Sequence, residues 1–120
     1  MKQIDVHIVS KTIDISLDGK IVKIITHFST GRQGHLTPRF DHGQIDPKLR
    51  FASYFSHTYK DKNGKDAAMP FALFFKDGCA FHAGNPDLPS HGCIHLQMDD
   101  AHWLYDWCGH DPVGVSIKDD

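Results

Sequence analysis

The sequence has no long apolar run. No stretch approaches the roughly 20 apolar residues that a membrane-crossing helix requires. The first residues, Met1 to His7, alternate between polar and apolar and lack the apolar segment of a secretory signal. We therefore expect neither a membrane-spanning helix nor a cleaved signal in this chain. Three origins stay open: a trimmed chain, a cytoplasmic protein, or a protein exported without a cleaved signal.

An excess of charge of either sign is also absent. Thirteen Lys and Arg residues stand against 15 Asp and Glu, the formal net charge is −2, and the two signs are interspersed. A broad cationic surface for nucleic acid is therefore not expected. With 120 residues, of which 40% are apolar, the chain can form one hydrophobic core but not two. Residues 1–120 are thus expected to form a single domain.

Cysteine is scarce: the chain contains Cys79, Cys93 and Cys108. The odd count means that at least one thiol has no partner within the chain. Two interpretations stay open. Either all three are reduced and mostly buried, or Cys79 and Cys108 form a disulfide in an oxidising compartment.

The paired Cys and His spacing of structural zinc sites is missing as well. Some residues could still act as ligands in some combination: His82, His91, Cys93, His95 and His102. His91 and His95 would share a face only on a helix, and Gly92 between them argues against a helix there. We therefore expect no metal and no cofactor, and a His/Cys metal-binding module remains an alternative.

Most of the chain has the patterns of β structure. Alternating or short apolar runs predict strands over residues 4–8, 13–17, 20–29, 69–75, 79–82 and 113–117. Asp18-Gly19 indicates a hairpin between the second and third of these strands. Residues 31–47 carry scattered glycines and prolines and predict a long irregular connection. Residues 51–59 fit a strand or a packed loop, and residues 61–66 fit a solvated turn.

One helix is predicted near the C-terminus. Asp99 or Asp100 can cap its start, and Gly109 lies where a left-handed C-terminal cap is required. Helical spacing places three apolar residues on one face between these ends: Trp103, Leu104 and Trp107. The sequence therefore predicts a mostly β fold with one or two helices.

The pattern with the most chemical content is Ser90-His91-Gly92-Cys93-Ile94-His95-Leu96, with His82 upstream of it. A cysteine attacks as the thiolate, and a nearby histidine can take its proton. Gly92 has no side chain, so backbone and substrate can approach closely there. The pattern indicates Cys93 as a nucleophile with a histidine base.

These residues resemble the signature of the YkuD-type L,D-transpeptidases, enzymes that remodel bacterial peptidoglycan. In that family a histidine precedes a Ser/Thr-His-Gly-Cys element, as His82 precedes Ser90-His91-Gly92-Cys93 here. Other elements follow the family's order: Ser29-Thr30-Gly31, Thr37-Pro38, Met69-Pro70-Phe71 and the closing helix and strand. The resemblance covers nearly the whole chain and implies the family's catalytic-domain fold, a β-sandwich or barrel-like arrangement.

The resemblance also implies catalytic roles. Cys93 attacks the donor stem peptide at the carbonyl of its third residue, a diamino acid, and the terminal D-Ala leaves. His82 takes the thiol proton and later returns a proton to the leaving amine. A backbone carbonyl just after this histidine orients the ring, so Ala83 or Gly84 is the candidate.

Four more residues have expected roles around the nucleophile. Backbone N–H groups at Gly92 and Cys93 should form the oxyanion hole. His91 should hold the loop or stabilise the thiolate, and Ser90 should fix the turn. His95 stands where many family members carry Asn or Arg, so it should bind a substrate carboxylate only when protonated.

Peptidoglycan stem peptides are thus the expected partner, met in the periplasm or cell envelope. The expected activity is transpeptidation or D-amino acid exchange through a thioester acyl-enzyme. The short segment 83–89 favours an open cleft and small acceptors. An L,D-carboxypeptidase that trims tetrapeptides to tripeptides and a non-catalytic binding module remain alternatives. Because no export signal is found, delivery as an antibacterial effector is a further hypothesis.

Overall fold

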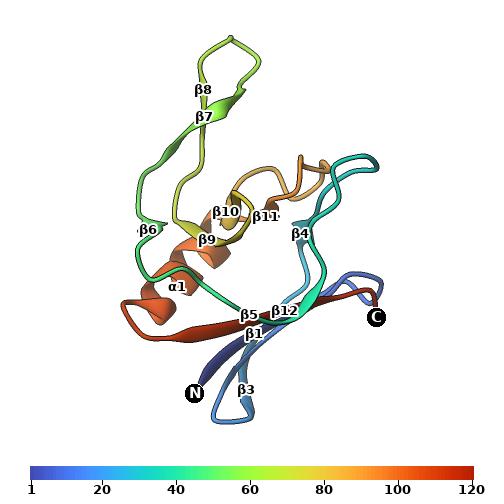
Figure 1. The fold of residues 1–120 in the computed structure, drawn as a ribbon, viewed down its shortest axis with the longest axis vertical. Helices are drawn as coiled ribbons and strands as arrows, with labels where there is room; N and C mark the ends of the chain where they lie inside the picture. The colour runs from blue at the N-terminus through green and yellow to red at the C-terminus, as the bar shows by residue number, and fades with distance from the viewer.

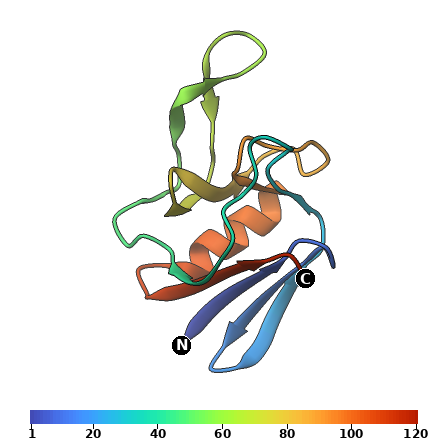
Figure 2. The same cartoon turned by 45° about the vertical axis from the view of Figure 1, so that its right-hand side comes forward.

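Two five-stranded sheets form most of the fold (Figures 1 and 2). The computed structural model describes all residues 1–120. The first sheet has the order β3-β2-β1-β12-β5. Its strands are β1 (Lys2–His7), β2 (Thr12–Leu17), β3 (Lys20–Ile25), β12 (Val113–Lys118) and β5 (Phe40–Gln44). Because β1 pairs in parallel with β12, the two ends of the chain lie side by side in this sheet.

The second sheet contains the cysteine motif and has the order β4-β11-β10-β9-β6. Its strands are β4 (Phe28–Ser29), β11 (Ile94–Leu96), β10 (Cys79–Ala83), β9 (Ala72–Lys76) and β6 (Arg50–Phe51). β10 and β11 are parallel, and their register sets His82 beside His95. Since β11 begins directly after Cys93, this pairing brings the upstream histidine to the cysteine element.

A separate hairpin of β7 (Phe55–Lys60) and β8 (Asp66–Ala68) projects from the body of the molecule (Figure 1). At its tip the Asp61 carboxylate accepts hydrogen bonds from the backbone N–H groups of Asn63 and Lys65. The tip is exposed, so the solvated turn predicted at residues 61–66 is confirmed, apart from Asp66 itself, which begins β8.

The single helix, α1 (Met98–Cys108), lies between the two sheets (Figure 2). The predicted start was wrong by a few residues: Gln97 is the N-cap, and Asp99 and Asp100 lie inside the first turn. Their negative charges interact favourably with the positive end of the helix dipole and so stabilise the start of the helix. At the other end Gly109 is the C-cap residue, and its N–H donates to the Tyr105 carbonyl at 3.1 Å. The predicted cap position and positive φ are confirmed, but with φ +51° and ψ −127° the residue is not in the left-handed helical conformation that the sequence predicted.

The core lies where the inner faces of the sheets meet the helix. The alternating residues of β1 and β2 are fully buried, and so are Leu104 of α1 and Phe81 of β10. These residues belong to one cluster: Ile4, Val6, Ile13, Ile15, Phe81, Ile94, Leu104, Val115 and Ile117. The mostly β prediction is therefore confirmed, and the two sheets remain open rather than closed into a barrel.

Two strand predictions need correction. Residues 20–29 do not form one strand, because β3 ends at Ile25 and β4 begins at Phe28 in the other sheet. Residues 31–47 are not wholly irregular, because β5 pairs antiparallel with β12 at the edge of the first sheet. Most side chains of β5 are exposed, so the strand lacks the apolar alternation that would reveal it.

The three cysteines are all free, so the Cys79–Cys108 disulfide is not present. Cys108 is fully buried in the main core, whereas Cys79 is half-buried beside Gly92. The structure also has no helix with the length and apolar character needed to cross a membrane.

Candidate active site

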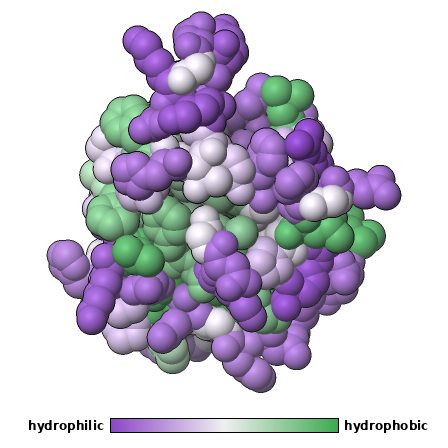
Figure 3. All heavy atoms as spheres, turned by 45° about the horizontal axis from the view of Figure 1, so that its top comes forward, coloured by the Kyte–Doolittle hydropathy of each residue, from purple (hydrophilic) through white to green (hydrophobic).

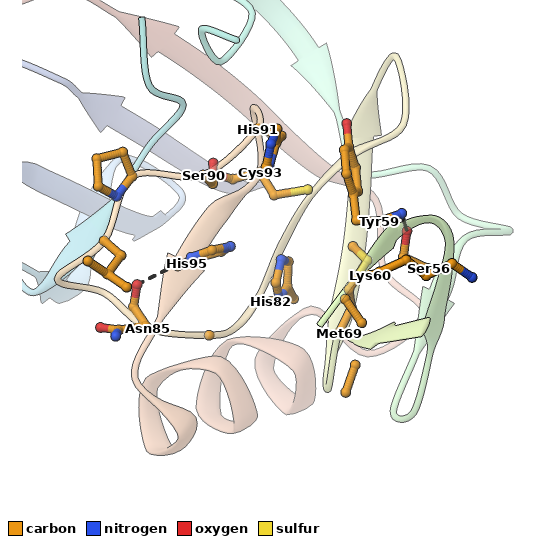
Figure 4. Close-up of a pocket in the computed structure, with 15 residues that line it drawn as sticks. Ser56, Tyr59, Lys60, Met69, His82, Asn85, Ser90, His91, Cys93 and His95 are labelled. Carbon is orange, nitrogen blue, oxygen red and sulfur yellow. Dashed lines mark hydrogen bonds between the residues drawn. The ribbon is translucent and has the colours of Figure 1, made fainter. Parts of the chain in front are cut away.

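A cavity of about 330 Å³ lies between the hairpin and the second sheet. Its walls come from the hairpin and Met69, the end of β10, the loop at residues 84–89, and the loop that carries Cys93. Figure 4 shows Cys93, His82 and His95 facing this cavity. The surface seen from the hairpin end is mostly hydrophilic, with separate apolar patches (Figure 3).

The Ser90 hydroxyl fixes the turn before Cys93. It accepts a hydrogen bond from the Gly92 N–H at 3.0 Å and donates one to the Cys93 carbonyl oxygen. The Gly92 N–H is therefore hydrogen-bonded to Ser90 and does not point freely into the cavity. The backbone N–H of Cys93, just before β11, makes none of the turn and loop hydrogen bonds.

Two N-terminal segments hold this loop from the other side. The Ser90 N–H donates to the Thr30 carbonyl and the Arg32 N–H donates to the Ser90 carbonyl, both at 2.9 Å. The buried Thr37 hydroxyl donates to the Gly92 carbonyl at 2.8 Å. The Ser-Thr-Gly and Thr-Pro motifs of the sequence therefore lie beside the loop that carries Cys93 and hold it through hydrogen bonds.

Glycine is required at position 92 for two reasons. Its φ is +126°, a backbone conformation that L side chains rarely adopt. A Cβ atom there would also lie 3.0 Å from the Cys79 sulfur. Gly92 thus lets the loop turn tightly against β10.

Cys93 is buried with 8% of its surface exposed, and its sulfur lines the cavity. The Sγ atom accepts a hydrogen bond from the Ala80 N–H at 3.4 Å. Burial raises the pKa of this thiol to about 11, against the smaller opposing effect of the Ala80 N–H. The resting group near neutral pH is therefore a thiol and not a preformed thiolate.

His82 presents one ring nitrogen to the backbone and keeps the other free. Nδ1 lies 2.8 Å from the Ala83 carbonyl oxygen, so Nδ1 carries the proton and donates it there. The orienting carbonyl is therefore that of Ala83, and Nε2 has a lone pair that can accept a proton. Burial lowers the pKa of His82 to about 4, so the ring is neutral near pH 7.

No hydrogen bond joins His82 to the Cys93 sulfur in this ligand-free structure. Both side chains nevertheless line the same cavity (Figure 4). Catalytic hydrogen bonds are often long without substrate and shorten in the substrate complex. The pair therefore has the groups needed for proton transfer, in the form of a neutral thiol and a neutral imidazole.

His95 is the direct neighbour of His82, with ring centroids 4.8 Å apart in an edge-to-face arrangement. Its Nδ1 lies 3.2 Å from the Asn85 carbonyl oxygen, so its Nε2 is a second acceptor at the cavity. Gly84 makes room for this ring, because a Cβ there would meet the His95 Cγ at 2.9 Å. Burial lowers the pKa of His95, which argues against a charged carboxylate-binding role near neutral pH.

His91 is exposed, and its ring joins the loop that carries Cys93 to the β7–β8 hairpin through a contact with Tyr59. Its ring stacks on Tyr59 with centroids 4.9 Å apart, and Arg32 Nη2 donates to its Nε2 at 3.1 Å. Slight desolvation, the Arg32 charge and His35 lower the pKa of His91. Of the two roles expected for His91, the contacts support holding the loop, since a neutral ring stabilises a thiolate weakly.

The hairpin supplies cavity residues that the sequence did not point to. They are Ser56, Lys60, Ala67 and Ala68, and the loop before the motif adds Asn85, Leu88 and Pro89. Tyr59 also lines the cavity, whereas Tyr54 packs against Phe51 and Phe74 instead. Met69, just after β8, completes this wall.

No group of three or more His, Cys, Asp or Glu side chains comes together in a way that could hold a metal ion. The site histidines instead hydrogen-bond to backbone carbonyls or to Arg32. The His/Cys metal-binding alternative therefore finds no ligand set here.

The neutral thiol leads to a prediction for alkylation. Iodoacetamide reacts with the thiolate, so the rate at Cys93 should rise about tenfold per pH unit and continue to rise up to about pH 10. Peptide mapping by mass spectrometry separates Cys93 from Cys79, and Cys93→Ala gives the background. A rate that is already high and flat near pH 7 would instead show a thiolate–imidazolium pair.

Comparisons with known proteins show the family and the fold of the chain. The family model for the L,D-transpeptidase catalytic domain, YkuD, matches residues 2–115. A search of curated proteins returns no match.

Three solved structures show the similarity of fold. The Stackebrandtia nassauensis L,D-transpeptidase is 22% identical with a TM-score of 0.82, covering 98% of this chain and 55% of that chain. Mycobacterium tuberculosis L,D-transpeptidase 1 is 21% identical with a TM-score of 0.73, covering 98% and 62%. L,D-transpeptidase 3 of the same organism, in complex with a faropenem-derived adduct, is 22% identical with a TM-score of 0.70, covering 96% and 60%. The chain thus spans little more than half the length of these proteins.

Proposed function

Because the chain belongs to the YkuD family of L,D-transpeptidase catalytic domains, we propose that it is a cysteine-dependent acyltransferase acting on peptidoglycan stem peptides. The observation that carries the proposal is the shared cavity of Cys93 and His82, with the His82 ring oriented by the Ala83 carbonyl. The substrate places this activity in the cell envelope. The reaction has two half-reactions that use the same two side chains.

Acylation begins when His82 Nε2 takes the Cys93 thiol proton. The sulfur then attacks the carbonyl of the third stem residue, and a tetrahedral oxyanion forms. The Cys93 N–H, which makes none of the turn and loop hydrogen bonds, is the proposed donor to this oxyanion, and one such donor typically lowers the barrier by about 2.7–4 kcal/mol. Collapse breaks the bond to D-Ala, His82 returns the proton to the leaving amine, and a thioester remains on Cys93.

Deacylation requires an acceptor that carries a proton. The acceptor attacks the thioester carbonyl while the neutral His82 takes its proton, the bond to the Cys93 sulfur breaks, and His82 then returns the proton to that sulfur. The Nε2 atom of His95 can accept a hydrogen bond from a further N–H or O–H group of the acceptor. A stem-peptide amine gives a 3–3 cross-link, a free D-amino acid gives exchange, and water gives an L,D-carboxypeptidase. A cavity of about 330 Å³, at the small end of ligand pockets, favours the smaller acceptors.

The test is a product analysis with purified disaccharide tetrapeptides, with and without added D-methionine. Mass spectrometry is expected to show D-methionine-containing tetrapeptides and tripeptides, and a smaller amount of 3–3 dimers. Cys93→Ala is the inactive control and Cys79→Ala the matched thiol control, which should keep the products. Unchanged substrate with wild type and Cys79→Ala alike would contradict the proposed function and favour a non-catalytic module.

A further inference from the structure

Cys79 is a thiol at the site that the proposed reaction does not use. We propose that Cys79 and Cys93 form a reversible disulfide that switches the enzyme off, an inference whose consequence for activity rests on the proposed function. The switch would make the enzyme depend on the redox state of its surroundings. The argument comes from where the two sulfurs lie and from what surrounds them.

The two cysteines are neighbours because the start of β10 lies against the loop that carries Gly92 and Cys93. The Cys93 sulfur lies 3.4 Å from the amide nitrogen of Ala80, which is bonded to Cys79. Covalent geometry therefore places the Cys79 Cα within about 6 Å of the Cys93 sulfur. The Cys79 sulfur in turn lies against Gly92, 3.0 Å from where a Cβ would stand. Each sulfur thus faces the residue next to the other cysteine.

The backbone at both cysteines has room to adjust. The pairing of β10 with β9 is irregular between Cys79 and Ala80, and Cys93 lies just before β11 starts. A disulfide needs Cα atoms about 4.4–6.8 Å apart, and an irregular strand pairing on one side with a loop end on the other lets both segments adjust toward that geometry. Both thiols are also reachable, because Cys79 is only half-buried and Cys93 lines the cavity. Cys108 is fully buried in the main core and is not a competing partner.

The chemistry is thiol–disulfide exchange with a small-molecule disulfide as the oxidant. His82 takes the Cys93 proton, and the sulfur attacks one sulfur of the oxidant, which releases one thiol and leaves a mixed disulfide. The Cys79 thiolate then attacks the Cys93 sulfur and displaces the second thiol. Two protein thiols are oxidised and one disulfide is reduced, so atoms and electrons balance. The linked Cys93 sulfur has no thiolate with which to attack a stem peptide.

The test incubates the folded chain with oxidised glutathione and follows its intact mass and its reaction with faropenem. Wild type is expected to lose the mass of two hydrogen atoms, and non-reducing peptide mapping should show Cys79 linked to Cys93. Oxidised wild type should no longer form a faropenem adduct, and dithiothreitol should restore it. Cys79→Ala is expected to keep its basal activity, to form no internal link and to carry glutathione on Cys93. Cys108→Ala should behave like wild type.

Two results would overturn the switch: wild type that carries glutathione on Cys93 and never forms the internal link, or a link that leaves faropenem labelling intact. Failure of the proposed function looks different. In that case the reduced wild type forms no faropenem adduct and no products, while the Cys79–Cys93 link is still found by mapping. The two proposals are therefore tested separately by one set of samples.

Discussion

Cys93→Ala is expected to lower the turnover of stem-peptide substrates by at least about 10⁴-fold, the scale of loss seen when an enzyme nucleophile is removed. No other thiol can replace it, because Cys79 points toward Gly92 and Cys108 is buried in the core. The readout is the rate of D-Ala release from purified tetrapeptides. Cys79→Ala, measured in reducing buffer, should retain the wild-type rate.

The same variant should remain folded. Removing one sulfur atom from a small satellite cluster with Met69, Ala72 and Ala80 should change the free energy of unfolding by about 1 kcal/mol. Thermal melts of both cysteine variants check this point. An active Cys93→Ala protein, or an equal loss in Cys79→Ala, would disprove Cys93 as the nucleophile.

His82→Ala is expected to lower the same rate by about 10²–10⁴-fold, the usual contribution of a general base. The pH profile of kcat/KM in wild type should fall on the acid side near pH 4, because burial lowers the pKa of His82 to about 4. A histidine with an ordinary pKa would place this limb near pH 6.5. His42→Ala, at an exposed position on β5, is the matched control and should not change the rate. If His95→Ala abolished the activity while His82→Ala retained it, His95 and not His82 would be the general base.

The low pKa of His82 also links stability to pH. Between about pH 6.5 and pH 4 the unfolded chain binds a proton at His82 and the folded chain does not. The free energy of unfolding should therefore fall as the pH falls through this window. Above about pH 6.5 the neutral His82 ring no longer lowers the free energy of unfolding. His82→Ala should flatten this part of the dependence in chemical denaturation followed by circular dichroism.

The sequence named Cys93 and His82 together, and both line one cavity, whereas parts of the scaffold around them were not predicted. Cys93 and His82 were indicated by residue type and order alone, because a nucleophile and its base are recognised by their chemistry. The strands β1, β2 and β12 were found for a different reason, since apolar residues recur at every second position in each of them. β5 was missed because its side chains are mostly exposed, and the break after Ile25 was missed because both halves of residues 20–29 are apolar.

The state of the site could not be read from residue order. Whether a thiol is ionised depends on how deeply it is buried, and burial is a property of the whole fold. The neighbouring rings of His82 and His95 likewise follow from the parallel register of β10 and β11, which joins residues with no local pattern in common. The use of the Gly92 N–H by Ser90 is a third such detail. These contacts decide the protonation states of the site and which backbone N–H groups remain free.

The most direct test of covalent catalysis is intact-protein mass spectrometry of the enzyme, quenched with acid shortly after mixing with a disaccharide tetrapeptide. We expect a species heavier by the donor acyl group without its D-Ala, bound as a thioester to Cys93 and absent from Cys93→Ala. Product formation with a protein mass that never changes, or an acyl group mapped to another residue, would contradict the account.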